Sequence, residues 1–165
     1  MPEILILDYQ FTAELWRLAY GVHYCGKRSL TFGYCCGVIC ICVGSFGLGG
    51  LFPSKLLAGL FLATGLFGVL QKQILIATAV RRACRQHFFA GNITVLVSPL
   101  ELAVRNDRRA CRHSWNHFVG YRRRDAGFFL YYTPNAFFFI PTSVLTAGYA
   151  KRLEQILEAA EVAKL

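Results

Sequence analysis

Two long apolar stretches near the middle of the chain limit the folds open to it more than any other feature. Positions 29 to 70 contain a single charged residue, Lys55. The first stretch covers residues 30–52, and the second runs from residue 56 to about residue 86. A bilayer core about 30 Å thick is crossed by roughly 20 apolar residues in a helix. The sequence therefore predicts two transmembrane helices.

The link between these helices is short and rich in helix-ending residues. Gly49 and Gly50 suit a helix C-terminus, Pro53 stops the helix, and Ser54 can cap the next one. Residues 53–55 therefore form a tight external turn, and the two helices form an antiparallel hairpin. Lys72 interrupts the second apolar stretch, and we expect its ammonium to reach the membrane surface. The alternative is a deeper span with Lys72 buried between helices.

The basic residues that flank the two stretches indicate the orientation of the hairpin. Only Lys55 lies between the stretches, whereas several basic residues either precede the first stretch or follow residue 70 in the second: Arg17, Lys27, Arg28, Lys72, Arg81, Arg82 and Arg85. Cytoplasmic flanks carry an excess of lysine and arginine. The sequence therefore predicts that both termini are cytoplasmic.

The first apolar stretch also contains four of the seven cysteines. Small residues at helical spacing allow two membrane helices to pack closely. We expect such helix packing from Gly33, Gly37, Gly44, Cys36 and Cys40. The alternative is a soft-metal or thiol site, because thiolates bind Cu(I) and Zn. Neither stretch contains a histidine or a carboxylate that would extend such a site, so the sequence predicts no metal and no cofactor.

The remaining segments, residues 1–29 and 87–165, predict one cytoplasmic β-domain. An apolar strand near Ile4 to Leu7 is followed by an amphipathic helix capped by Thr12, and this strand has no local partner. After residue 87 come several short strands and an amphipathic helix at the end. We expect a small antiparallel sheet or partial barrel closed by that helix, with the N-terminal strand added to the same sheet.

Two groups of arginines in the β-domain are candidates for contacts with a membrane surface or a partner. We expect the first group on a strand hairpin and the second in a loop: Arg105, Arg108, Arg109 and Arg112, then Arg122, Arg123 and Arg124. An anionic leaflet attracts such residues, and an acidic protein partner is the alternative. Nucleic acid is not expected, because the aromatic runs FFLYY and FFFI are typical of core strands rather than of exposed stacking surfaces.

Motifs of known enzyme chemistry are absent from the sequence. The nine acidic residues are scattered, and no Ser-His-Asp spacing, phosphate-binding glycine loop or HExxH occurs. The four histidines, at positions 23, 87, 113 and 117, are the alternative source of a zinc site, with Cys111 beside His113. We expect no enzymatic activity.

The order of elements resembles a known family. Ser114-Trp115 precedes two aromatic strands at residues 128–132 and 136–140, which are followed by Pro141 and the terminal helix. This pattern, after an N-terminal strand, a helix and a two-span hairpin, resembles the YcxB-like bacterial membrane proteins. The resemblance implies a pleckstrin-homology-like cytoplasmic domain in a bacterial inner-membrane protein. It implies no catalytic residues, and the cysteine-rich first stretch and the Arg122–Arg124 run depart from it.

These features together predict a membrane α+β protein without catalytic activity. Its β-domain is expected to bind a protein or lipid headgroups at the membrane, and the hairpin could also mediate a homodimer. One alternative is an immunity-type protein that protects against a toxin acting at the inner membrane. A more distant alternative is a thiol-dependent carrier of soft metals.

Overall fold

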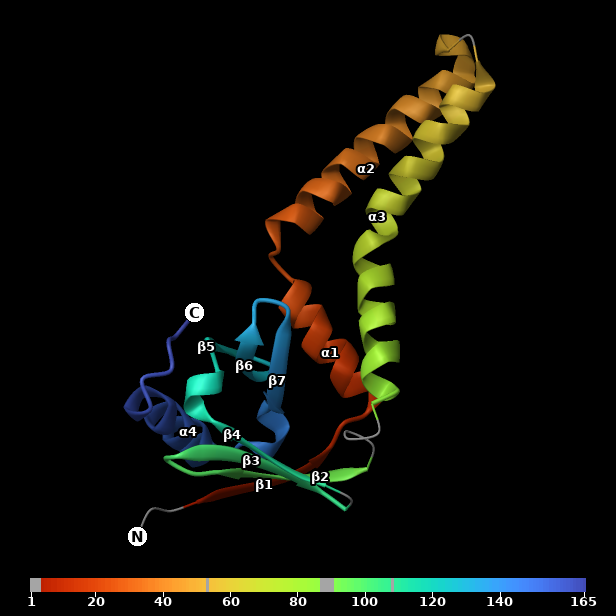
Figure 1. Ribbon diagram of the computed structural model, residues 1–165. Coiled ribbons are helices and arrows are strands. Elements are labelled where there is room, and N and C mark those ends of the chain that lie inside the picture. The colour runs from red at the N-terminus through yellow and green to blue at the C-terminus, as the bar shows by residue number, and fades with distance from the viewer. Residues whose placement is uncertain (1–3, 53, 87–90, 108) are drawn as a thin grey trace. The chain divides into compact units, whose positions relative to one another are not determined.

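A computed structural model describes residues 4–52, 54–86, 91–107 and 109–165 (Figure 1). The chain divides into two compact units. One unit combines Met1–Val22 with Arg82–Leu165 and contains all the described strands; we call it the β-domain. The other unit is His23–Arg81, which we call the helical hairpin.

The first sheet of the β-domain has four antiparallel strands in the order β1-β2-β3-β4. Its strands are β1 (Leu5–Gln10), β2 (Asn92–Val97), β3 (Glu101–Asn106) and β4 (Ala110–Ser114). Along β1 every second side chain is buried, and β2 shows the same alternation. One face of this sheet therefore covers the core, and the other carries polar and charged residues together with the exposed Ile6.

The second sheet has three antiparallel strands in the order β5-β6-β7. Its strands are β5 (Gly120–Arg124), β6 (Gly127–Thr133) and β7 (Ala136–Pro141). In the central strand β6, five consecutive residues starting at Gly127 are buried. A continuous buried run indicates that both faces of this strand are covered.

Helix α4 (Ala147–Ala159) and most of helix α1 (Ala13–Tyr24) belong to the β-domain. Helix α1 begins at Thr12, whose hydroxyl accepts a hydrogen bond from the Leu15 amide at 3.2 Å. Its Tyr20 ring packs edge-on against Phe137 of β7, with centroids 5.3 Å apart. Helix α4 buries Ala150, Leu153, Ile156 and Leu157, and Thr146 caps its first turn. The terminal helix is thus an amphipathic element that covers the core.

The N-terminal strand pairs with the strands that follow residue 87, as the sequence predicts. All six residues of β1 are paired with β2, from Leu5 opposite Val97 to Gln10 opposite Asn92. The expectation of a single sheet or partial barrel is corrected, because the described strands form two sheets. The break follows β4, where Trp115–His117 forms a 3-10 turn with a buried Trp115. The indole donates to the Ser98 carbonyl at 3.1 Å, which fixes the chain as it leaves the first sheet.

The helical hairpin consists of α2 (Arg28–Phe46), a π-helical turn (Gly47–Leu51) and most of α3 (Lys55–Cys84). Gly50 ends the first helix with a φ of 107°, a conformation that glycine adopts without steric strain. Two helical spans, Arg28–Gly50 and Lys55–Cys84, are long and apolar enough to cross a membrane. The two long apolar helices predicted from the sequence are therefore present.

Candidate functional site

The first group of arginines lies around the β3–β4 hairpin of the β-domain. Arg105, Arg109 and Arg112 are exposed, and Arg108 lies outside the described residues. The hairpin is closed by the Asn106 amide, which donates to the Arg109 carbonyl at 2.9 Å, and by the Asn106 side chain, which accepts from the Arg109 amide at 2.6 Å. Arg112 makes a long ion pair of 3.7 Å with Glu101.

A polar hollow of about 410 Å³ lies beside Arg105. Asn92, Thr94, Asn106 and Asp107 complete its lining. Thr94 stands between Arg105 and Asp8 in the strand register, and its hydroxyl donates to the Asp8 carboxylate at 2.6 Å. The hollow therefore contains both signs of charge, and Arg105 alone does not make it an anion site.

The second group of arginines forms part of strand β5, which corrects the loop expected from the sequence. Arg122, Arg123 and Arg124 stand opposite Phe129, Phe128 and Gly127 of β6. Alternation along a strand sends Arg123 to one face, and Arg122 and Arg124 to the other. Three consecutive arginines do not show the apolar pattern of a strand. The segment is nevertheless a strand, because it pairs with the aromatic strand β6.

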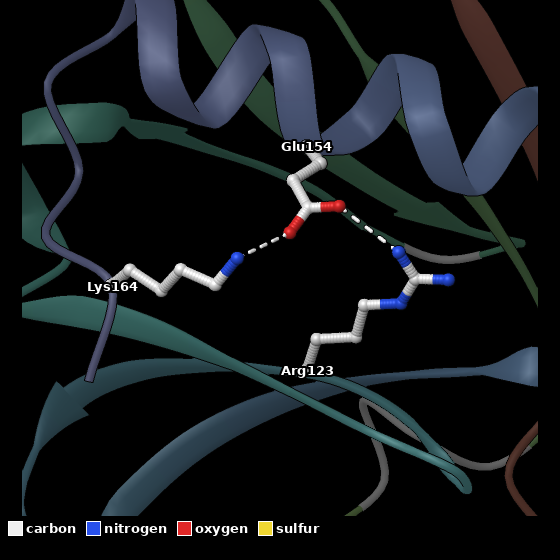
Figure 2. Close-up of polar contacts among 3 residues, drawn as sticks. All are labelled: Arg123, Glu154 and Lys164. Carbon is white, nitrogen blue, oxygen red and sulfur yellow. Dashed lines mark hydrogen bonds and ion pairs between the residues drawn. The ribbon is translucent and has the colours of Figure 1, made fainter.

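Arg123 belongs to a three-residue ionic cluster that links β5, α4 and the end of the chain (Figure 2). The Glu154 carboxylate accepts from Arg123 Nη1 at 3.0 Å and from Lys164 Nζ at 2.8 Å. The hydrogen bond from Lys164, opposed by partial burial and reinforced by Arg123, lowers the pKa of Glu154. Arg123 therefore takes part in an ion pair within the domain. Arg122 and Arg124 lie on the opposite face of β5, away from this cluster.

The segment that contains Lys164 also extends the second sheet. The Tyr121 amide donates to the Ala163 carbonyl at 2.7 Å, and the Leu165 amide donates to the Tyr121 carbonyl at 2.8 Å. Gly120 permits this approach, because a Cβ there would lie 2.6 Å from the Ala163 oxygen. Residues 163–165 therefore cover part of the β5 edge.

The histidines that suggested a zinc site have other surroundings. The His113 ring packs on Tyr132 at 5.3 Å between centroids, and burial, aided by His117, lowers the pKa of His113. Burial, with a smaller contribution from Cys111, raises the pKa of Tyr132 to about 12. Within the described part of the chain no three His, Cys, Asp or Glu side chains come together in a way that could hold a metal ion, and His87 lies outside it.

The glycines singled out in the first span lie along the contact between α2 and α3. A Cβ at Gly37 would lie 2.8 Å from the Gly65 carbonyl oxygen, and one at Gly44 would lie 2.8 Å from the Leu62 side chain. At Gly33 it would meet the Gln71 side chain at 2.7 Å. Cys36 and Cys40 are half-buried, whereas Cys35 and Cys42 are exposed.

The small residues on the opposite helix were not predicted from the sequence. Gly65 and Gly68 of α3 lie as close to α2 as the α2 glycines lie to α3. A Cβ on Gly65 would lie 2.6 Å from the Gly37 carbonyl oxygen, and a Cβ on Gly68 would lie 2.8 Å from the Gly33 carbonyl oxygen. The available signal was their spacing of three residues, which places both on one face of a helix. Close backbone contact requires small residues on both helices. The glycines of the first span therefore predicted only one side of the contact.

The fold thus defines a class of protein: a two-sheet β-domain whose sequence is interrupted by a long apolar helical hairpin. Comparison with known families matches residues 111–157 to the family described as YcxB-like protein. This region runs from β4 to α4 and includes the whole second sheet. The C-terminal region of the chain is therefore YcxB-like, as the resemblance in the sequence indicated. No curated protein and no solved structure matches the chain.

Proposed function

We propose that the chain is a multi-pass protein of the bacterial inner membrane that has no catalytic activity. In this proposal α2 and α3 cross the bilayer, and the pleckstrin-homology-like β-domain binds a protein partner or lipid headgroups at the cytoplasmic surface. The YcxB-like match at residues 111–157 supports the family context. The seven described strands in two sheets, followed by a helix, support the domain type.

The observation that carries the proposal is the distribution of side-chain size in the hairpin. The buried residues along the α2–α3 contact are small, such as Gly37, Gly65 and Ala58. Large apolar side chains point away from it; Phe32 is 72% exposed and Leu56 is 80% exposed. A water-soluble helical pair has the reverse arrangement, with large apolar residues in the contact. Small residues inside and large apolar residues outside suit helices surrounded by lipid.

The exposed apolar surface is also extensive. In the most apolar part of each span, only 17% of the residues of Arg28–Gly50 and 6% of those of Lys55–Cys84 are buried within the chain. Water would penalise such exposure at roughly 25 cal/mol for each Å². Insertion into hydrocarbon removes this penalty, and the helical backbone satisfies its own hydrogen bonds there.

The interaction role of the β-domain rests on its exposed arginines. Arg105, Arg109, Arg112 and Arg124 are exposed, and the half-exposed Arg122 lies on the same face of β5 as Arg124. The segments on both sides of the hairpin are basic. The same segments set the proposed orientation, with both termini in the cytoplasm. A basic β-domain held at that surface would meet an anionic leaflet, where each arginine contributes about 1 kcal/mol.

Topology and extraction test the membrane part of the proposal. The full chain should stay with membranes after alkaline carbonate extraction. Single-cysteine tags at residue 1 and residue 165 should resist an impermeant maleimide in spheroplasts and react after lysis. Extraction of the chain into the soluble fraction, or labelling of either end from outside, would contradict the proposal.

Crosslinking in the membrane tests the interaction part. Wild-type protein and an Arg122→Gln, Arg124→Gln variant should be crosslinked in cells, and the captured proteins and lipids compared. We expect the variant to lose a discrete crosslinked species that wild type retains. A matched control is Lys151→Gln, Arg152→Gln on α4, which removes the same charge from another exposed site. Equal crosslinking by all three proteins would remove the role assigned to the β5 arginines.

A further inference from the structure

A cleft inside the helical hairpin has the chemistry of a phosphate site. It has a volume of about 330 Å³ and lies between the segment that begins α2 and the middle of α3. Gly26, Leu30, Thr31 and Tyr34 contribute to one wall. Gly68, Val69, Lys72 and Gln73 form the other wall, and Tyr24 completes the lining. The cleft thus combines one cation with hydroxyl and amide groups.

Lys72 brings a positive charge that nothing in its own unit can neutralise. The sequence contains no aspartate or glutamate between Glu14 and Glu101, so His23–Arg81 has basic residues and no acidic ones. Among the described residues, no ion pair or hydrogen bond involves the half-buried Lys72 side chain. A half-buried ammonium is stabilised by a counter-ion. That anion must come from outside the hairpin.

The groups around Lys72 suit an oxyanion with several acceptor oxygens. A lysine ammonium offers three donors, a glutamine amide two, and a tyrosine hydroxyl one. Gln73 and Tyr34 provide the latter two in the lining of the cleft. A second cation lies nearby, because Lys27 Nζ is 5.0 Å from the ring centroid of Tyr24, another lining residue. Lys72 and the neutral donors between the helices, with Lys27 beside a lining residue, suit a basic pocket of the kind that holds phospholipid headgroups.

The position of Lys72 along α3 matches the depth of a headgroup. Lys55 begins α3 at the turn of the hairpin, and Lys72 lies 17 positions further along the helix. At a rise of 1.5 Å per residue this separation is about 26 Å, close to the thickness of the hydrocarbon core. If Lys55 marks one interface, Lys72 reaches the other.

We propose that the Lys72 cleft binds a phosphate group, with the headgroup of an anionic phospholipid as its source. This inference rests on the proposed insertion of the hairpin, because only then do lipid phosphates lie at the level of the cleft. Bound phosphate would neutralise Lys72 and contact both helices where they meet the cytoplasmic surface. The free inorganic ion shares the same chemistry and is the other source to be distinguished.

Lipid titration of the full-length protein tests the proposal. The protein, in phosphatidylcholine mixed micelles, is titrated with phosphatidylglycerol, and native mass spectrometry measures the affinity of the first bound molecule. Lys72→Gln should weaken it about fivefold, which corresponds to the ~1 kcal/mol of one basic residue at an anionic surface. Lys72→Arg should retain most of the affinity.

Lys55→Gln is the matched control, since it removes the same charge from the start of α3, outside the cleft. Weakening by Lys72→Gln alone supports the proposal. Equal affinities in the Lys72→Gln and Lys55→Gln proteins overturn it. If Lys72→Gln does not accumulate, Lys72→Met, which suits an apolar helix, takes its place in the same comparison.

A second arm separates the two phosphate sources. Sodium phosphate is added to the protein in phosphatidylcholine alone, and the thermal unfolding midpoint is measured. No shift supports the lipid as source, whereas a shift that disappears in Lys72→Gln assigns the cleft to the free ion and overturns the lipid assignment. Alkaline extraction of the same variants tests membrane insertion separately from phosphate binding. Loss of wild-type protein from the membrane contradicts the proposed function. An inserted protein without Lys72-dependent binding contradicts only this inference.

Discussion

At the scale of single residues, Tyr9 joins the two sheets of the β-domain through one hydrogen bond. Its hydroxyl donates to the Phe139 carbonyl of β7 at 2.8 Å. Burial raises the pKa of Tyr9 well above its ordinary value, so the hydroxyl remains a donor at physiological pH. The bond connects β1, from the N-terminal segment, to the YcxB-like region.

We expect Tyr9→Phe to lower the free energy of unfolding of the β-domain by about 1–2 kcal/mol, because a buried carbonyl would lose its donor. The measurement is chemical denaturation of the full-length protein followed by near-ultraviolet circular dichroism. Tyr149→Phe is the control, since Tyr149 is 41% exposed on α4 and its loss of a hydroxyl should change little. Equal stability of Tyr9→Phe and wild type would mean that the bond contributes nothing.

Glu154 makes the stability of the β-domain dependent on pH. Its pKa is lowered in the folded state, chiefly by the hydrogen bond from Lys164. A carboxylate whose pKa is depressed on folding stabilises the fold above its unfolded pKa, and this stability is lost as pH falls through the folded pKa.

Wild type should therefore lose its advantage over Glu154→Gln as pH falls from above the ordinary glutamate value of 4.5 to below the folded pKa of Glu154. Thermal midpoints of both proteins across this range measure the difference. The difference at neutral pH should also shrink at high salt, because Arg123 and Lys164 are solvent-exposed. A constant difference across pH would exclude the linkage.

At the scale of elements, the contact between α2 and α3 depends on the lack of side chains at a few positions. Gly37 and Gly65 face each other so closely that a Cβ on either would lie within 2.8 Å of the other's carbonyl oxygen. Backbone atoms cannot move aside as a flexible side chain can, so a larger residue must separate the helices. The element is therefore sensitive to size at its contact and tolerant elsewhere.

Gly65→Leu should reduce the membrane level of the protein and increase its proteolysis, because it separates the two helices. Gly59→Leu in the same helix is the matched control, since no atom lies within 4 Å of a Cβ there. Quantitative immunoblots of washed membranes measure both. A membrane level of Gly65→Leu equal to that of Gly59→Leu would show that the glycine contact is dispensable.

The cysteines of the same helix provide an independent prediction. A thiol among apolar groups behaves as a small side chain, so replacing Cys35, Cys36, Cys40 and Cys42 with Ala should leave membrane level and phenotype nearly unchanged. Loss of phenotype at a normal membrane level in this variant would instead indicate thiol chemistry, because alanine cannot replace a thiolate ligand.

At the scale of the whole molecule, the β-domain is assembled from segments on both sides of the hairpin. Strand β1 supplies Leu5, Leu7 and Tyr9 to the core, and its partner β2 follows α3 in the chain. Without β1, the buried face of the first sheet would lose apolar contacts, and β2 would become an unpaired edge.

Deletion of residues 1–10 should therefore destabilise the β-domain in the full-length chain. The measurement is limited proteolysis of membranes with detection of fragments from the C-terminal region. Adding a peptide of residues 1–12 to the isolated segment 87–165 should restore resistance. If segment 87–165 melts as well alone as with the peptide, the N-terminal strand is not required for the fold.

The sequence by itself determined the features that depend on local pattern. Two long apolar stretches specify long apolar helices, Gly50 ends the first one, and Thr12 caps α1, because helix length, backbone freedom and capping act within a few residues. The need of the N-terminal strand for a distant partner also followed, since a lone strand leaves its backbone groups unpaired. The small residues of α2 were recognisable for the same reason, through their spacing on one helix.

The tertiary structure decided the features that depend on which distant residues meet. Trp115 and its turn divide the strands into two sheets, and pairing with β6 places Arg122–Arg124 in a strand despite their charge. Glu154 lies 31 residues from Arg123 and 10 from Lys164, so no helical or strand spacing in the sequence predicts their ionic cluster. Gly65 and Gly68 likewise acquire their role only from the helix opposite. Burial and strand pairing between distant residues outweigh weak local preferences, and these contacts exist only in the folded chain.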